Sequence, residues 1–319
     1  MQIKTISKSI KAKLTEWLET ITDEKLRKRV KDNILVSGGS ITSMFLNLPI
    51  NDYDIYIKDR DVLMDLVKYY VHDYKKDILI LDGKNRQEHI HPQSSLERVE
   101  SIEGAFSSAI RNLKDDQIKL FILTGNGGLK VNEEIEKEKL NYTPLFFSPN
   151  AISLSNQLQI VIRFFGNSEQ IHKTFDFIHA TNYFTFEDGL VTNKEALESI
   201  LTKQLKYQGS FYPVTSIIRA KKFLKRGWNI NAGELLKIMF QISLLDLQNP
   251  DVLEEQLLGV DVSYFERLII ILRSIQDKKK EDGKIDELMT PEYFNSIIDK
   301  IFNEDESDNE EDTKVIEQK

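Results

Sequence analysis

The sequence contains no cysteine among its 319 residues. Disulfides, thiolate zinc sites and cysteine nucleophiles are therefore excluded, and any metal must be held by oxygen ligands or by the five histidines. The sequence also lacks an apolar run approaching the roughly 20 residues that cross a bilayer. Its first residues, MQIKTISKSIKAKL, do not form the continuous apolar segment of a signal peptide. These absences predict a soluble, cytoplasmic protein without a membrane partner.

Negative charge gathers at the C-terminal end. Residues 303–319 carry eight acids against Lys314 and Lys319, so this segment holds a net charge of −6 out of the total of −8. The rest of the chain is close to neutral, which leaves room for a nucleic-acid partner. The segment has too few apolar residues for their burial to offset the conformational entropy lost on ordering, and we expect it to be disordered.

The apolar patterns along the chain predict an α+β protein. The N-terminal part alternates between the two element types, with expected helices over 9–31, 41–48 and 60–74 and expected strands over 34–36, 52–57 and 78–81. Short β-rich runs between residues 117 and 164 predict an antiparallel extension of the same sheet. The result is a mixed sheet with flanking helices.

The domain organisation follows from a change of pattern after Asp188-Gly189, where helical repeats of apolar residues begin. Helices are expected over 194–205, 214–226, 232–247, 251–258, 262–278 and 291–302. We therefore assign a mixed α/β domain to residues 1–189, with an insertion around 83–145, a helical domain to residues 190–302 and a disordered acidic tail to residues 303–319.

Two neighbouring motifs indicate a functional site. They are the turn Gly38-Gly39-Ser40 and, after a spacer of eleven residues, the strand segment Asp52-Tyr53-Asp54-Ile55. Residues two apart on a strand point to the same side, so the carboxylates of Asp52 and Asp54 are expected to converge and to need a cation. Mg²⁺ fits because it prefers oxygen ligands and commonly keeps substrate phosphates as others. Backbone N–H groups at the glycine turn and the hydroxyl of Ser40 can hold a phosphate. Turn and acids together imply a metal-bound polyphosphate.

This pattern resembles the motif of nucleotidyltransferases of the DNA polymerase β superfamily, in which a glycine turn between strand and helix precedes an acid-apolar-acid-apolar strand. The resemblance implies a third acid on a neighbouring strand. Asp176 is the best candidate, because the segment FDF reads as a strand with both rings facing the core and the acid facing the opposite side. Asp188 and Glu187, which fall at a turn, are the runners-up.

The same resemblance implies a mechanism. Asp52, Asp54 and Asp176 would be the catalytic residues and would hold two Mg²⁺ ions, with Mn²⁺ as a substitute. Gly38, Gly39 and Ser40 would bind the phosphates of a nucleoside triphosphate such as ATP. Catalysis would then depend mostly on positioning and on charge neutralisation.

A longer block, SPNAISLSNQLQIVIRFFG followed by IHKTFDFIHA, is similar to predicted nucleotidyltransferases of large tailed bacteriophages. The resemblance covers roughly residues 34–230. It implies a viral origin, with the host cytoplasm or the virion as the location, and it names no substrate.

Other groups carry weaker signals. One expected helix carries four basic residues, Arg219, Lys222, Lys225 and Arg226. These side chains either contact phosphates of a nucleotide or nucleic acid, with Trp228 or Phe223 stacking on a base, or form a solvated face near the end of the helix. These two readings stay open. His172 and His179 flank Asp176 and are expected to be structural. His89 and His91 have a spacing compatible with a metal but no obvious third ligand.

Two functions from different classes follow. The first is a metal-dependent nucleotidyltransferase that transfers a nucleoside monophosphate from a nucleoside triphosphate to a hydroxyl of a nucleic-acid end, a small molecule or a protein, releasing pyrophosphate. The alternative is a catalytically silent protein of this fold that serves as a binding or structural component, for example in a virus particle.

Overall fold

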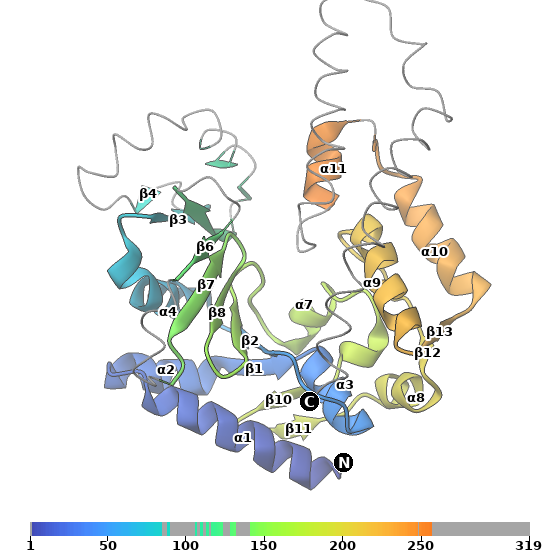
Figure 1. The fold of residues 1–319 in the computed structure, drawn as a ribbon, viewed down its shortest axis with the longest axis horizontal. Coiled ribbons are helices and arrows are strands. Elements are labelled where there is room, and N and C mark those ends of the chain that lie inside the picture. The colour runs from blue at the N-terminus through green and yellow to red at the C-terminus, as the bar shows by residue number, and fades with distance from the viewer. Residues whose placement is uncertain are drawn as a thin grey trace, which may run out of the picture. The chain divides into compact units, whose positions relative to one another are not determined.

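A computed structural model describes residues 2–84, 88–89, 116–123, 128–131, 141–247 and 249–256, together with Phe106, 109–110 and 113–114. The chain divides into two compact units (Figure 1). The first comprises Met1–Ser210 and Gly227–Asn231, and the second comprises Phe211–Arg226 and the chain from Ala232 onward. No helix in these described parts is long and apolar enough to cross a membrane.

The first unit is built on an eight-stranded mixed sheet with the strand order β11-β10-β1-β2-β9-β8-β7-β6. Neighbouring strands are antiparallel, except that β2 and β9 are parallel. The strands are β1 (Ile34–Ser37), β2 (Tyr53–Ile57), β6 (Leu129–Lys130), β7 (Pro144–Ser148), β8 (Ala151–Leu154), β9 (Leu158–Val161), β10 (Tyr183–Thr185) and β11 (Gly189–Val191).

Smaller elements complete the described structure. A three-stranded sheet has the order β4-β3-β5, and β12 pairs in parallel with β13. These strands are β3 (Ile78–Asp82), β4 (Glu88–His89), β5 (Ile118–Ile122), β12 (Gln204–Leu205) and β13 (Asn229–Ile230). The helices of the first unit are α1 (Ile3–Glu19), α2 (Glu24–Asn33), α3 (Gly39–Leu46), α4 (Arg60–Val71), η1 (His72–Tyr74), α7 (Ser168–His172), η4 (Ile178–Ala180) and α8 (Lys194–Thr202). Those of the second are α9 (Pro213–Lys225), α10 (Ala232–Ile242) and α11 (Pro250–Gln256).

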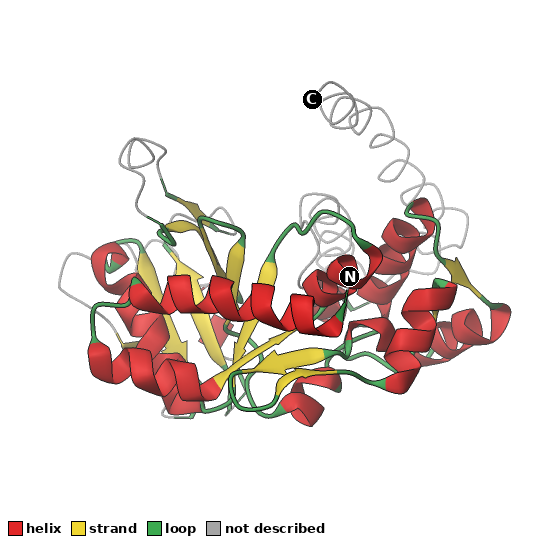
Figure 2. Cartoon of the chain, turned by 90° about the horizontal axis from the view of Figure 1, so that it is seen from below, coloured by secondary structure: helices red, strands yellow, loops and turns green. Residues whose placement is uncertain are grey.

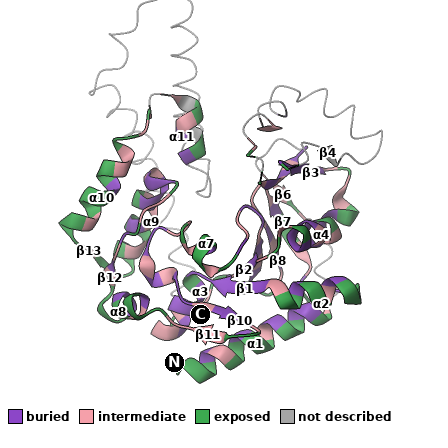
Figure 3. Ribbon diagram, turned by 180° about the vertical axis from the view of Figure 1, so that it is seen from behind, coloured by how far each residue is buried: buried purple, intermediate pink, exposed green. Residues whose placement is uncertain are grey.

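Alternation along the strands gives the large sheet two different faces. On one face Val36, Ile55 and Ile160 are fully buried in the main core, together with apolar side chains of α1, α2 and α4. Figure 2 shows the long N-terminal helix lying across the strands, and Figure 3 shows the inner strands and the inward sides of the helices as buried. On the other face Leu35 and Tyr56 form a smaller cluster with residues of α7. Asp54 lies on this second face because it alternates with Tyr53 and Ile55 of the main core.

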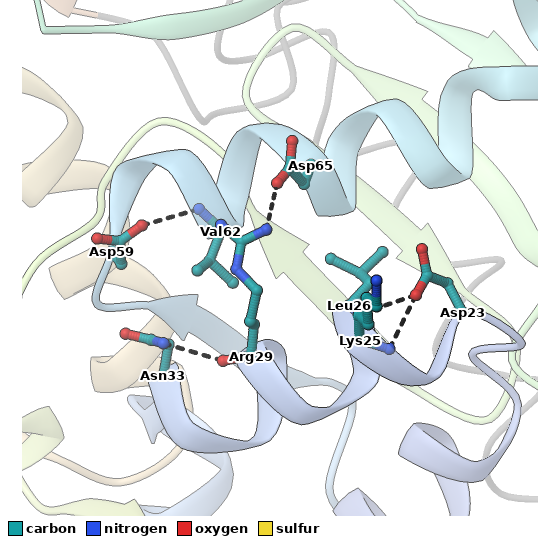
Figure 4. Close-up of polar contacts among 8 residues, drawn as sticks. All are labelled: Asp23, Lys25, Leu26, Arg29, Asn33, Asp59, Val62 and Asp65. Atoms are coloured by element: carbon teal, nitrogen blue, oxygen red, sulfur yellow. Dashed lines mark hydrogen bonds and ion pairs between the residues drawn. The ribbon is translucent and has the colours of Figure 1, made fainter.

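The N-terminal helix expected over 9–31 is wrong in one respect, because two helices occupy this region. The chain leaves α1 at Thr20, and Asp23 then caps α2 by accepting hydrogen bonds from the backbone N–H groups of Lys25 and Leu26 (Figure 4). An aspartate that caps a helix favours a new start over continuation of the preceding helix. The two helices still share the face that covers the sheet.

α2 and α4 are joined at their surface as well as in the core. Arg29 donates a hydrogen bond to Asp65 at 2.5 Å, and Asp59 caps α4 through the N–H of Val62 (Figure 4). Both partners of the ion pair are about half exposed, so the pair contributes no more than about 1 kcal/mol. Packing of the apolar sides therefore holds these helices on the sheet.

The α+β class and the mixed sheet with flanking helices are confirmed. Within 175–177 the expected strand is wrong: Asp176 lies in a bend, and only Phe177 forms an isolated bridge, with Tyr207. A three-residue alternation is too short to distinguish a strand from a bend packed on the core. Helix α8, which the sequence groups with the helical domain, lies in the first unit. His91, most of the insertion, the helices expected over 262–278 and 291–302 and the acidic tail lie outside the described residues.

Removing the hydroxyl of Tyr70 is expected to destabilise the first unit by about 1–3 kcal/mol. The buried indole N–H of Trp17 donates to this hydroxyl at 2.8 Å, so Tyr70→Phe leaves the N–H without its acceptor in the core. Urea unfolding followed by circular dichroism measures the change. Tyr74→Phe is the matched control, because Tyr74 is half-buried and its ring packs against Phe147. Equal midpoints for the two variants would show that the Trp17–Tyr70 bond contributes nothing.

Candidate functional site

The turn between β1 and α3 has a backbone conformation that requires glycine at its first position. Gly38 has φ of 103° and ψ of −152°, a region that residues with a side chain hardly adopt. No side chain caps α3 at this residue. The first N–H groups of α3 therefore have no side-chain acceptor at the turn, which is the usual chemistry of an anion site at a helix start.

Asp54 lies directly beside this turn. A Cβ atom built on Gly38 would stand 3.1 Å from Oδ2 of Asp54, and that oxygen is the nearest atom it would meet. The absence of a side chain at Gly38 thus allows the carboxylate to approach the backbone of the turn. Two motifs that are separated in sequence are brought together at the ends of β1 and β2.

Ser40 and Gly39 give the turn two further properties. The Oγ atom of Ser40 is buried and has no hydrogen-bond partner among the described residues. A buried hydroxyl without a partner costs about 1–3 kcal/mol. A Cβ built on Gly39 would meet nothing within 4 Å, so space is open beside that residue. The turn therefore has an unsatisfied hydroxyl and room next to its backbone.

Asp52 precedes β2 by one residue and is exposed. The pKa of its carboxyl is nevertheless raised above the ordinary value, because the surrounding protein partly removes it from water. The ionised carboxylate is therefore less stable at this position than at an open surface, and a nearby cation would stabilise it.

A buried serine fixes the turn to the rest of the fold. The hydroxyl of Ser37 lies 2.9 Å from the carbonyl oxygen of Asn182, 3.1 Å from that of Ala180 and 3.0 Å from Nε2 of His172. Since the hydroxyl has one proton to donate to a carbonyl, Nε2 of His172 donates to Ser37. The N–H of Gly38 also donates to Ala180, and Thr42 Oγ1 donates to the carbonyl oxygen of His179.

The two histidines of this segment are at least partly buried, and a structural role for them stays a prediction. Burial lowers the pKa of His172 to about 4 and that of His179 to about 3, so both rings are neutral near pH 7. Neutral rings are poor counterions for phosphate. Trp228 is buried, with its ring 4.6 Å from that of His179, and is not available for the expected stacking on a ligand.

Asp176 is placed differently from Asp52 and Asp54. It is buried, and its carboxylate accepts a hydrogen bond of 2.6 Å from Ser210 Oγ. Within the described residues no three Asp, Glu or His side chains are grouped closely enough to hold one metal ion. The structure therefore brings Asp54 to the glycine turn but does not gather Asp176 with the other two acids. Asp188 is held by Thr185 in the turn between β10 and β11.

Sequence reasoning missed two neighbours of Asp54. Gln159 of β9 pairs with Asp54, and Ser37 of β1 follows Val36, which pairs with Ile55. The alternation in LQIVI marks Gln159 as the polar-face residue of a strand, but only the sheet order shows that the strand lies beside β2. No local signal points to the contacts of Ser37.

The basic residues of α9 belong to the second unit. Lys222, Lys225 and Arg226 are exposed at the C-terminal end of this helix, and Arg219 is half-buried. Cations in this place complement the helix dipole. Their role in contacting phosphates stays a prediction.

The fold and the site together define an α+β protein in which a glycine turn meets a strand carboxylate on one face of a mixed sheet. The profile of Gad2, described as the Gabija anti-defense 2 family protein, matches residues 8–203. The chain therefore belongs to the Gabija anti-defense 2 family.

A relative and several solved structures show similarity at low identity. The chain is 21% identical over 225 residues to "Gabija anti-defense 2" of Bacillus phage SPbetaL7, a match that covers 66% of this chain and 54% of that protein. The chain thus spans about half the length of this curated relative.

The fold is distantly similar to that of tRNA-processing enzymes. The Thermotoga maritima CCA-adding enzyme complexed with tRNA is 13% identical, with a TM-score of 0.35 over 82% of this chain and 54% of that one. A tRNA nucleotidyltransferase complexed with a primer tRNA and an ATP analogue is 11% identical, with a TM-score of 0.34 over 81% and 60%. A tRNA-processing enzyme in an apo form is 13% identical, with a TM-score of 0.35 over 87% of this chain and 76% of that one.

Proposed function

We propose that the protein binds a nucleoside triphosphate with Mg²⁺ and transfers the nucleoside monophosphate to a hydroxyl group. The observation that carries this proposal is the approach of the Asp54 carboxylate to Gly38, beside the buried hydroxyl of Ser40 that has no partner among the described residues. A phosphate at the turn would give this hydroxyl an acceptor. A cation would offset the electrostatic repulsion between the phosphate and the carboxylate next to it.

The residues present fit one divalent cation. Asp52 and Asp54 supply carboxylate oxygens, and Mg²⁺ is commonly bound by one or two carboxylates together with waters and substrate phosphates. When bound, the ion would offset the charge of the triphosphate and of the leaving pyrophosphate. Participation of Asp176, and with it a second ion, requires an arrangement that brings this carboxylate to Asp52 and Asp54, because no three such side chains are grouped within the described residues.

The chain's own groups have defined tasks in this proposal. The backbone N–H groups of Gly39 and Ser40 and the Ser40 hydroxyl would donate to phosphate oxygens at the start of α3, where the helix dipole also favours negative charge. Ser37 and His172 would keep the turn in this geometry. The acceptor would be a hydroxyl of a nucleic-acid end, a small molecule or a protein.

The family gives this activity a biological setting. Its description and the name of the phage relative both refer to anti-defence against Gabija. We place the chain in the same role, so that nucleotide transfer to a host or defence component would be the means of counteracting the defence.

A second candidate function is nucleotide binding without turnover. It is favoured by two observations: the partner of Asp54 on the parallel strand β9 is Gln159 and not an acid, and no three acids are grouped closely enough within the described residues to hold one metal ion. In this case the protein would hold a nucleotide, or a nucleotide-carrying partner, at the same turn.

Pyrophosphate release distinguishes the two functions, and metal removal tests whether the release depends on Mg²⁺. Incubation with each of the four α-labelled nucleoside triphosphates and Mg²⁺, in the presence of RNA, DNA or protein acceptors, is expected to release pyrophosphate and to label one acceptor class. Excess EDTA should abolish both signals. Binding by calorimetry without pyrophosphate from any mixture would support the second function, and absence of both binding and release would refute both.

A further inference from the structure

Asp54 is one member of a row of side chains that crosses the sheet. Gln159 of β9 pairs with Asp54, Ser153 of β8 pairs with Gln159, and Phe146 of β7 pairs with Ser153. Their sequence neighbours Ile160, Ile152 and Phe147 all point into the main core. Gln159, Ser153 and Phe146, here called the strand row, therefore share with Asp54 the face opposite to that core.

The strand row has the chemistry of a binding surface for a molecule with both polar edges and a flat ring. Gln159 and Ser153 are half-buried, and Gln159 Nε2 donates to Ser153 Oγ at 3.3 Å. After this bond the amide keeps one N–H donor and its carbonyl acceptor, and the serine keeps its O–H donor. Phe146 is 39% exposed, and its ring lies over Gly128, where a Cβ would collide with it.

On the other side of Asp54, over β1, this face of the sheet is covered by another segment of the chain. Ser37 is fully buried and bonded to His172, Ala180 and Asn182, so the segment that follows α7 occupies the face over β1. His172 also packs on the ring of Tyr183, which pairs with Ser37. A ligand anchored at Asp54 and the glycine turn therefore finds its polar contacts in the opposite direction, over β9 and β8.

We infer that the strand row binds the nucleoside part of the nucleoside triphosphate: Gln159 and Ser153 hydrogen-bond the sugar or the base, and Phe146 stacks on the base. Adjacent strands are about 4.8 Å apart, so Gln159 lies about 5 Å and Phe146 about 15 Å from Asp54 along the row. This span matches the extent of a nucleotide whose phosphates lie at the turn. The inference rests on the proposed function, because it takes the triphosphate to be at Gly38–Ser40.

Two probes separate the strand row from the phosphate turn. Calorimetry in Mg²⁺ compares a non-hydrolysable ATP analogue with inorganic tripolyphosphate, which has no nucleoside. Gln159→Ala and Phe146→Ala should each weaken binding of the ATP analogue about tenfold or more, as expected for loss of a hydrogen-bonded or stacked base, and leave tripolyphosphate binding unchanged. Phe146→Leu keeps an apolar side chain over Gly128 and should show the same loss if Phe146→Ala folds poorly.

The control is Leu145→Ala, a neighbouring residue of β7 whose exposure of 36% is close to that of Phe146. It should bind both probes like the wild type. Unchanged binding of the ATP analogue by Gln159→Ala and Phe146→Leu would overturn the inference, and so would an equal loss for both probes. If the wild type binds neither probe, the proposed function itself fails.

Discussion

Replacement of Asp54 by asparagine is expected to reduce Mg²⁺-dependent pyrophosphate release by at least about 100-fold. Asparagine has nearly the same shape, so the contact with Gly38 and the fold are preserved. The variant loses the negative charge that would hold a cation beside the turn, and in phosphoryl transfer most of the rate comes from such charge neutralisation and positioning. Release of pyrophosphate from labelled nucleoside triphosphate is measured at equal protein concentration and saturating substrate.

Asp61→Asn is the matched control for this experiment. Asp61 lies in the first turn of α4, with a largely exposed side chain, and the substitution removes one unit of negative charge from the same region of the sequence. We expect wild-type release from it. Activity of Asp54→Asn equal to that of the control would mean that Asp54 does not serve catalysis, and a shared loss would point to net charge as the cause.

The second large effect is expected at Gly38. Alanine at this position would have to adopt φ of 103°, at a cost of about 1–3 kcal/mol, and its Cβ would stand 3.1 Å from Oδ2 of Asp54. Gly38→Ala should therefore both lower the free energy of unfolding and displace the carboxylate from the turn. Nucleotide binding is expected to fall at least about tenfold, measured by calorimetry beside urea unfolding.

Gly39→Ala separates the two causes. The backbone of Gly39 is not left-handed, and an added Cβ would meet nothing within 4 Å, so stability should stay within about 0.5 kcal/mol of the wild type or rise slightly. If phosphates occupy the open space beside Gly39, the methyl group should weaken their binding although the fold is intact. Full binding by Gly39→Ala would place the phosphates elsewhere.

Much of the frame of the site could be predicted from local sequence. The strand, glycine turn, helix and strand between Ile34 and Ile57 follow from short-range patterns, since capping, glycine conformation and alternation act between near neighbours. Such patterns predict a turn at Gly38 and place the acids at the strand that follows the helix. The structure adds that Asp54, and not Asp52, lies within the strand beside the turn.

The remaining features of the site depend on pairing between residues that are far apart in the sequence. The phenylalanines on both sides of Asp176 predict a strand, yet the bend and the bond to Ser210 are set by the segment of residues 204–210, which pairs with it. Gln159 could be recognised as polar-facing but not as the neighbour of Asp54. Chain segments that are distant in sequence decide both cases, and a single sequence contains no direct signal of such contacts.

The parallel pairing of β2 with β9 has a consequence for the order of events during synthesis. Tyr53 and Asp54 leave the ribosome well before their partners Leu158 and Gln159. Until then, one side of β2 has unpaired N–H and C=O groups, which are prone to pair with other chains. Closing so long a loop is slow compared with forming helices or hairpins. Nucleotide added during refolding should therefore bind only late, after the central strands have joined.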